Sequence, residues 1–553
     1  MNMKKILSIA VLCAVAVSAM AVPARPGWQT RTQADGTAIE VQLCGDEFYH
    51  YTVNRDGKQV QLNTETGMYE VIGDAPTGDI VKARRARLPR ANARRARQEF
   101  GKTPNLAPRG IVILVNFTDK AFQAAHTRTV FDSLCNAVDC KVNKDGTKYY
   151  PSAGQYFLSQ SNGLYHPVFD VYGPVTLSRN MKYYGENDSQ DNDKRPAVAV
   201  VEACKLLENS VDFTLYDSDE DGKIDFVYMI YAGEAESSTE VANQIWPHAF
   251  SIDEEFEYQD TNFTSVYPNI DSCKVDGKQV NTYACSSELS GSSIDGIGTL
   301  CHEFSHVMGL PDFYDTEYGT NYNSKLTPNE WDVMDGGAYN GNGHCPPNYS
   351  AWEKYFFGWV EPKNLGDQGA SLTLYPNGSE EYNVYQINEA GELQSATTDG
   401  LNYYIEFRKK TGWDTNLPAT GMLIWKVDYD ENLWVQNTPN NGGRRDTAPH
   451  YTLVIPSGTK IGVSYGAKNV WPYSVNKIVY NSWKGVTGKP LTDITNHRDS
   501  ITLVYIEEGE EPVDPQGVED IHGDKVQATK VIRNGQVLII RNGVIYDLNG
   551  RVL

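Results

Sequence analysis

The pattern of apolar and polar positions changes several times along the chain. Residues 22–81 show short alternating runs separated by turn-forming pairs such as Asp35-Gly36, which predicts short strands joined by turns. The run 109–117 is apolar almost throughout and predicts a buried strand. The run 226–232 predicts a second buried strand.

Helical periodicity occurs in the same part of the chain. The stretches 153–161 and 196–209 have helical spacing, and 299–310 is the predicted helix that carries the chemistry. Beyond Trp359 the sequence becomes rich in Tyr, Gly and Asn, with short strand candidates at 403–407, 421–427 and 451–455. This change predicts a β-sandwich-like domain after an α+β part.

A basic segment separates the first strands from the rest. Between positions 82 and 102 the chain has nine Lys or Arg residues against one acid, Glu99, although its formal net charge is −22. A solvated basic helix is one explanation, but we favour a protease-sensitive connector between a propeptide and a catalytic domain. The expected order is a signal peptide (1–21), a β-rich propeptide with its basic linker (22–102), a catalytic domain (103–360), the β-sandwich-like domain (361–508), and an acidic linker with a short tail (509–553).

The N-terminus has the features of an export signal. Lys4 and Lys5 precede an apolar run at 6–17, and the small-residue cleavage site 19–21 follows. The run is too short to cross a hydrocarbon core of about 30 Å, and no later segment suits that role, so no transmembrane anchor is expected. We predict a protein that is secreted or at the cell surface. In that compartment Cys135/Cys140 and Cys273/Cys285 are close enough in sequence to pair.

Charge narrows the choice of partner. A net charge of −22 argues against nucleic acid, because nucleic-acid binders gain affinity from Lys and Arg that neutralise phosphates. Calcium binding or plain solubility explains the acidity better.

The strongest chemical signal is His302-Glu303-x-x-His306, inside the predicted helix. At about 100° per residue, the two histidines lie one turn apart on one face, opposite an apolar face. Both imidazoles can therefore bind one metal ion, and Glu303 can reach a water molecule on that ion without being a ligand. Gly309 and Pro311 end the helix, so Asp312 can supply a third, oxygen ligand after a sharp turn.

These residues predict a zinc-dependent hydrolase. Three protein ligands leave the fourth position of Zn²⁺ for water, whose pKa the metal lowers towards neutrality. Glu303 would act as the general base and then return the proton to the departing amine. A chance match to the short motif is expected on the order of 0.01 times in a chain of this length.

The motif and its surroundings resemble the immune inhibitor A family of secreted bacterial zinc metallopeptidases. The extended H-E-x-x-H-x-x-G-x-x-D pattern is similar to that of short-spacer metzincin-type enzymes, and the resemblance covers roughly 105–500. Ser305 departs from it, since the family often has Gly there. The resemblance implies a metzincin-like catalytic domain with a mixed sheet and an active-site helix, and endopeptidase activity on proteins. The matching pieces include 110–117, 245–248, 310–315, 331–335, 351–354 and 421–428.

Further candidate site residues follow from the resemblance, in the case of Met334, or from their positions along the chain. Met334 is the candidate for the methionine of a turn under the zinc, although a core methionine would occupy a similar environment. Tyr339 is the candidate donor to the oxyanion of the tetrahedral intermediate, with His344 as a second guess. Glu330 is the alternative third zinc ligand, because another class of zinc peptidases uses a later Glu. Cys44 or Asp46 would keep a zymogen latent if either ligated the ion.

A second metal motif lies at 217–225. It has the spacing of a calcium loop, with Gly222 at the sharp turn. Position 12 is Tyr228 rather than Glu, so a structural Ca²⁺ site is predicted rather than a sensor, and an acidic solvated turn is the alternative. The candidate residues are Asp217, Asp219, Asp221, Lys223 and Asp225.

Other functions remain open at this point. Residues 530–553 resemble tails that a gram-negative outer-membrane export machinery reads, or they form a small terminal hairpin. A non-catalytic surface or carbohydrate-binding protein is the alternative to a secreted endopeptidase, and a zinc amidase on cell-wall substrates is another. Glu303 argues against the binding protein, which would not need a general base.

Overall fold

The computed structural model describes residues 22–80, 109–138, 152–316, 327–441, 449–454, 470–472 and 489–506, with gaps at 26, 48, 64, 78–79, 189–191 and 219, together with position 456 and three strands between 528 and 546. Contacts divide the chain into two compact units, Met1–Glu507 and Glu508–Leu553. The expected signal peptide and the whole basic segment 82–102 lie outside the described residues, as do Cys140 and Asp219.

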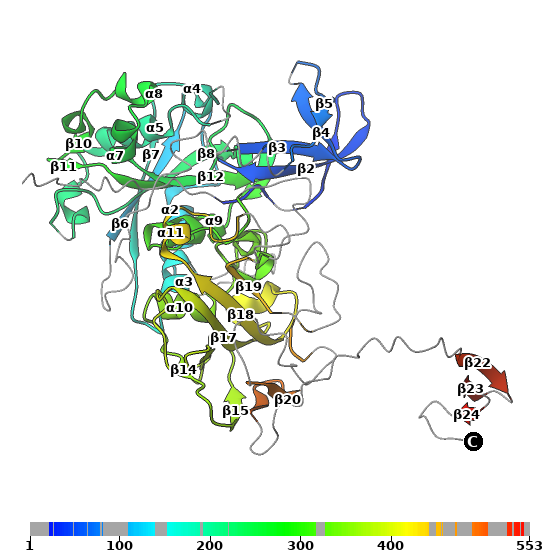
Figure 1. The fold of residues 1–553 in the computed structure, drawn as a ribbon. Helices are drawn as coiled ribbons and strands as arrows, with labels where there is room; N and C mark the ends of the chain where they lie inside the picture. Colours follow the sequence, from blue (N-terminus) through cyan, green and yellow to red (C-terminus); the bar gives the residue numbers. More distant parts are fainter. Residues whose placement is uncertain are drawn as a thin grey trace, which may run out of the picture. The chain divides into compact units, whose positions relative to one another are not determined.

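Five strands form an antiparallel N-terminal sheet (Figure 1), in the order β1-β2-β3-β4-β5. One side of it packs on the following part of the chain. Tyr49 and Tyr51 share a hydrophobic cluster with Tyr314, and Leu43 shares another with Trp246. The strands are β1 (Gln29–Thr32), β2 (Ala38–Asp46), β3 (Tyr49–Asn54), β4 (Lys58–Asn63) and β5 (Met68–Asp74).

The central sheet is mixed, as the sequence predicts. Its strand β6 (Arg109–Asn116) lies between β7 (Val168–Thr176) and β8 (Val227–Glu234) and is parallel to both. Strand β12 (Thr282–Ser290) pairs in parallel with β8 and extends the sheet. The short strands β9 (His248–Ser251) and β13 (Ser293–Ile294) pair with β12 in antiparallel fashion.

Helices cover both faces of this sheet, which explains the continuous apolar run of β6. Val112 and Leu114 share a cluster with Phe304 of helix α9 (Gly298–Val307). The alternate residues Ile111 and Ile113 share a different cluster with helix α5 (Pro196–Leu207). Because successive side chains of a strand point to opposite faces, a strand covered on both sides needs apolar residues at every position.

Shorter elements surround the sheet. The helices are α2 (Arg128–Asn136), α3 (Ala153–Gln160), α4 (Met181–Gly185), α6 (Glu236–Thr239), α7 (Ile252–Glu257), α8 (Thr261–Thr264), α10 (Ala351–Phe356) and α11 (Glu431–Val435). A small hairpin pairs β10 (Lys274–Val275) with β11 (Lys278–Gln279). Single 3-10 turns are η2 (Phe213–Tyr216), η3 (Ile270–Cys273), η5 (Asn329–Trp331), η6 (Gly336–Tyr339) and η7 (Gly412–Asn416).

Two further sheets form the β-rich region after the catalytic helix. One has the order β14-β16-β17-β18-β19 and the other β15-β21-β20. Leu374, Ile405 and Leu503 come from both sheets and belong to one hydrophobic cluster, so the two sheets share a core. The strands are β14 (Lys363–Asn364), β15 (Ala370–Leu374), β16 (Tyr385–Ile387), β17 (Gly400–Arg408), β18 (Gly421–Tyr429), β19 (Tyr451–Leu453), β20 (Leu491–Asn496) and β21 (Ile501–Tyr505).

The β-rich region is joined to the preceding part by a buried charge network. The Arg408 side chain is fully buried and donates to both Asp414 carboxylate oxygens, at 2.6 and 2.7 Å. It also donates to Glu406 Oε1 at 3.3 Å and to the carbonyl oxygen of Asn348 at 2.8 Å. Trp425 and Trp352 belong to the same hydrophobic cluster as Phe304, so apolar packing also crosses this boundary.

The second unit is described by itself. It holds an antiparallel sheet of β22 (Ala528–Arg533), β23 (Gln536–Arg541) and β24 (Val544–Tyr546).

The structure corrects one covalent expectation. Cys273 and Cys285 are both free and buried, so their predicted pairing is wrong. Cys285 lies in β12 with its Sγ 3.5 Å from His248 Nδ1, whereas Cys273 ends η3 near the carbonyl oxygen of Asn269. Sequence proximity therefore did not bring the two thiols together. No helix in the described part of the chain is long and apolar enough to cross a membrane.

Candidate active site

Helix α9 lies in the interior, with all of its residues buried. Its start is held tightly, because a Cβ atom at Gly298 would lie 1.8 Å from the carbonyl oxygen of Ala338. Its end is set by Gly309, which has a φ of 108° that favours glycine. Helix α9 therefore ends three residues before the end of the predicted helix 299–310, and the chain turns there towards Asp312.

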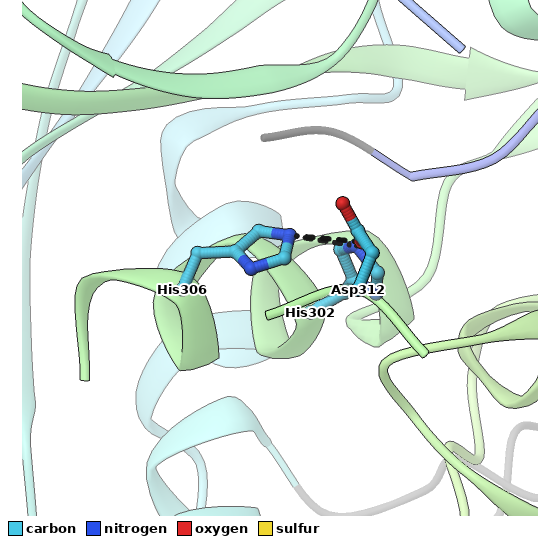
Figure 2. Close-up of side chains that lie close together, drawn as sticks. All are labelled: His302, His306 and Asp312. Carbon is cyan, nitrogen blue, oxygen red and sulfur yellow. Dashed lines mark hydrogen bonds and ion pairs between the residues drawn. The ribbon is translucent and has the colours of Figure 1, made fainter. Parts of the chain in front are cut away.

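Three side chains converge at the end of this helix (Figure 2). The Nε2 atoms of His302 and His306 are 3.0 Å apart, and Asp312 Oδ1 lies 3.1 Å from the first and 3.3 Å from the second. All three side chains are fully buried. Among the described residues, they are the only group of three potential metal ligands that meet in this way.

Backbone carbonyls fix the orientation of both imidazoles. His302 Nδ1 lies 2.7 Å from the carbonyl oxygen of Val333, and His306 Nδ1 lies 2.9 Å from that of Leu310. A carbonyl oxygen only accepts, so each Nδ1 carries a hydrogen, and each Nε2 faces the centre of the group, where it offers a lone pair when the imidazole is neutral. This is the usual arrangement around metal-binding histidines.

The donor set fits a zinc ion. Two atoms bound to one tetrahedral Zn²⁺ at about 2.0–2.1 Å are about 3.3–3.4 Å apart, close to the distances in this group. Within the described part of the chain Asp312 Oδ1 has no hydrogen-bond donor, and its close polar neighbours are the Nε2 atoms of the two imidazoles. Burial works to lower the pKa of His302, but Asp312 more than offsets it and raises the pKa to about 9.

The third ligand candidate is also held by a distant side chain. Asn437 Nδ2 donates to Asp312 Oδ2 at 2.6 Å, and the backbone N–H of Asp312 donates to Asn437 Oδ1 at 2.6 Å. Glu330, the alternative, is absent from the converging group. Its backbone carbonyl accepts from Asn340, and burial raises the pKa of its carboxyl.

Glu303 contacts the N-terminal segment of the described chain. The backbone N–H of Val22 donates to Glu303 Oε1 at 2.9 Å, and Trp246 Nε1 donates to the carbonyl oxygen of Val22 at 3.2 Å. Tyr339 Oη donates to the carbonyl oxygen of Pro23 at 2.6 Å. A stretch of peptide backbone therefore lies between the candidate general base and the candidate oxyanion donor.

The remaining predicted residues have mixed surroundings. Met334 is fully buried, and its carbonyl oxygen accepts from the N–H of Phe313, next to Asp312. Burial lowers the pKa of the His344 side chain. The backbone N–H of His344 donates to the carbonyl oxygen of Gly341, and no described hydrogen bond joins His344 to the segment at Val22. Cys44 packs with Tyr49 and Tyr51 and is not part of the converging group.

The charged side chains of the acidic loop at 217–225 already have hydrogen-bond partners inside and outside the loop. Asp217 Oδ2 accepts from Lys278 Nζ at 2.5 Å and from the N–H of Gly222 at 3.1 Å. Asp225 Oδ2 accepts from Ser218 Oγ at 2.5 Å, and Lys223 Nζ donates to Asp253 at 2.7 Å. Asp221 accepts from the N–H of Lys223. The described carboxylates of this loop do not form a converging group.

Sequence reasoning missed Asn437, Val22 and Pro23 as residues of this site. Each lies far along the chain from the residue it contacts, and none belongs to the local motif. The only signal for the last two was the predicted cleavage site next to Val22.

The part of the chain that contains the His302–Asp312 motif is similar to a known protein family. Residues 109–366 match the family model described as "Immune inhibitor A peptidase M6, catalytic domain". The chain is 28% identical over 228 residues to the Pre-pro-metalloprotease PrtV of Vibrio cholerae serotype O1 (strain M66-2), a match covering 37% of this chain and 23% of that protein. It is 27% identical over 253 residues to Immune inhibitor A of Bacillus thuringiensis subsp. alesti, a match covering 41% of this chain and 34% of that protein.

The chain thus spans only about a quarter to a third of the length of these relatives. The family match contains helix α9, Asp312 and Met334, and it ends well before Asn437. The convergence of His302, His306 and Asp312 lies inside this match. Residues 109–366 are therefore a metallopeptidase catalytic domain of the immune inhibitor A peptidase M6 type.

Proposed function

We propose that the chain is a zinc endopeptidase that hydrolyses peptide bonds of proteins, with His302, His306 and Asp312 as metal ligands. The observation that carries the proposal is the peptide backbone held at the site. Glu303 accepts from the N–H of Val22, and Tyr339 donates to the carbonyl oxygen of Pro23. Peptide backbone thus reaches both the candidate general base and the candidate oxyanion donor, through groups of two different peptide bonds.

The roles of the side chains follow from their positions. A bound zinc ion would polarise the scissile carbonyl and acidify a water molecule at its open position. Glu303 accepts the proton of the attacking water and returns it to the leaving amine. Tyr339 donates to the carbonyl oxygen as negative charge develops there. Burial raises the pKa of the Tyr339 phenol well above its usual range, so it keeps its proton while it donates.

The test is cleavage of casein by the processed chain, compared with Glu303→Ala at matched zinc content. The proposal expects wild-type cleavage that depends on zinc, and loss of cleavage in the variant with zinc still bound. Unchanged cleavage by Glu303→Ala would contradict it. Zinc-loaded wild type that cleaves no protein would favour the binding-protein alternative.

We further propose that 22–102 is a propeptide whose first residues block the site. The contacts of Val22 and Pro23 support this, because a substrate could not reach Glu303 and Tyr339 while they persist. The expected signal peptide and the printed name of the Vibrio protein, a pre-pro-metalloprotease, support an exported zymogen. Cleavage in the basic linker should then raise activity, and equal activity before and after cleavage would contradict the blocking role.

A structural Ca²⁺ site at 217–225 and an export role for 530–553 also stay proposals. Calcium would have to compete with the Lys278 contact at Asp217. The first is tested by calcium titration of thermal stability. The second is tested by secretion of a chain that ends before position 530.

A further inference from the structure

The Asp312 carboxylate divides its two oxygens between two kinds of partner. Oδ1 faces the imidazoles of His302 and His306, whereas Oδ2 accepts from Asn437 Nδ2 at 2.6 Å. The backbone N–H of Asp312 donates to Asn437 Oδ1 at 2.6 Å. These two hydrogen bonds run in opposite directions, so they fix which way the Asn437 amide faces and which oxygen of Asp312 is left for a metal.

Asn437 is itself held firmly. It follows helix α11, its backbone N–H donates to the carbonyl oxygen of Trp434, and its exposed fraction is 3%. Trp434 packs against Phe313 and Trp352, with ring centroids 6.2 and 5.8 Å apart. The amide is thus anchored to the same aromatic core that supports the residue after Asp312.

We propose that Asn437 is a positioning residue of the metal site, which holds Asp312 as a ligand through Oδ1 alone. The inference rests on the proposed zinc ligation by Asp312. Without the amide, Oδ2 would be a buried acceptor without a donor, and the carboxylate could rotate towards the metal or away from it. The β-rich region beyond residue 366 therefore completes a site whose ligands all lie within the matched catalytic domain.

The substitution must remove the side chain without straining the backbone. Asn437 has a φ of 56°, in the left-handed region that glycine adopts readily and alanine does not. Asn437→Gly is therefore the informative change. Asn441→Gly is the matched control, because Asn441 accepts from Thr316 at 3.0 Å in the same loop and does not contact Asp312. Asn437→Gln keeps an amide on a longer side chain.

The experiment measures zinc affinity of the full chain by competition with a chelator, and the absorption spectrum of the cobalt-substituted protein. Loss of a hydrogen bond to a metal ligand typically weakens metal binding about 10–100-fold, so Asn437→Gly should lose zinc affinity by this factor and show an altered cobalt spectrum. Asn437→Gln should recover part of the affinity, and Asn441→Gly should bind like wild type.

Two results would overturn the proposal. One is wild-type zinc affinity and cobalt spectrum in Asn437→Gly, or, if the glycine variant does not fold, in Asn437→Asp, which keeps an acceptor for the Asp312 N–H but has no donor for Asp312 Oδ2. The other is an equal loss in Asn441→Gly, which would mean that the loop matters only as a support. Failure of wild-type chain to bind zinc, or no effect of Asp312→Ala, would instead contradict the proposed function.

Discussion

The two metal motifs of this chain are held in different ways. At the first, His302, His306 and Asp312 are fully buried and turn their ligand atoms towards one another. At the second, Asp217 already contacts Lys278, and the neighbouring carboxylates contact groups of the same loop. Both motifs have the spacing of a metal site, but in the part of the chain that the structure describes only the first brings three ligand atoms together.

The difference shows that the groups in contact with the ligand side chains decide whether a motif can bind a metal ion. Carbonyl oxygens hold the far nitrogens of the histidines, so the near nitrogens must face the centre. At the acidic loop, Lys278 opposes metal binding, because its ammonium group supplies a positive charge next to Asp217 where a cation would bind. We therefore expect tight zinc binding at the first motif and weak or conditional calcium binding at the second.

Removal of a ligand tests this comparison most strongly. His306→Ala should weaken zinc binding about 10²–10³-fold, since a structural zinc site gains about 10–16 kcal/mol from about four ligands. Asp217→Ala should leave zinc affinity within about twofold. Chelator competition measures both, and a comparable loss in the two variants would remove the distinction between the motifs.

Metal removal should separate the motifs by stability. Free zinc at about 100–1,000 times its dissociation constant stabilises the folded chain by about 2.7–4.1 kcal/mol, so chelation should lower the melting temperature by several degrees. Calcium added to the zinc-loaded protein should change it by less. Differential scanning fluorimetry measures the shifts, and a larger shift from calcium than from zinc would reverse the comparison.

Tyr339→Phe tests whether the zinc motif has a dedicated oxyanion donor. The variant should lose about 10²–10³-fold in kcat, as expected for one such donor, with zinc content unchanged. KM should move much less, because the hydrogen bond strengthens in the transition state. A variant with wild-type kcat would show that Tyr339 serves only to hold Pro23.

The smallest expected effect is on pH dependence. Burial raises the pKa of Asp335, next to Met334, to about 7. Burial also works to raise the pKa of Asp217, but the hydrogen bond from Lys278 overcomes it and lowers that pKa. An unfolded Asp titrates at about 3.9, so folded Asp335 binds extra proton between about pH 4 and 7, and the free energy of unfolding falls as pH rises through that window. Asp217 has the opposite sign and acts below about pH 4.

Urea unfolding from pH 5 to 8 measures this contribution. Asp335→Asn should flatten the slope by up to about 1.4 kcal/mol per pH unit. Asp217→Asn should not change the slope in this range. Equal slopes in wild type and Asp335→Asn would show that the carboxyl is ionised in the folded chain.

Local patterns predicted much of this molecule. The buried strand at 109–117 and the helices at 153–161 and 196–209 appear as β6, α3 and α5, because each depends on residues close in sequence. The placement of His302 and His306 on one helix face needed only the helical repeat. The prediction of Asp312 as a site residue needed one further inference, a chain turn at Gly309, and the glycine itself indicates that turn.

The rest depended on contacts that sequence spacing does not encode. Asn437 lies 125 positions from Asp312, and Val22 lies 281 positions from Glu303. Nothing in the local sequence of either residue marks it as part of a site. The free Cys273 and Cys285 show the same limit, since proximity along the chain did not place their thiols together.

The buried Arg408 has a consequence for how the molecule melts. Its guanidinium bonds Asp414 and Glu406 from the β-rich region and a carbonyl oxygen at Asn348, all out of contact with water. Separating the catalytic part from the β-rich part would break the hydrogen bonds that this buried ion cluster makes with the backbone of Asn348, at a cost of about 1.5–3 kcal/mol each. The catalytic part and the β-rich part, which also share one hydrophobic cluster, should therefore unfold together, as a single cooperative peak in calorimetry.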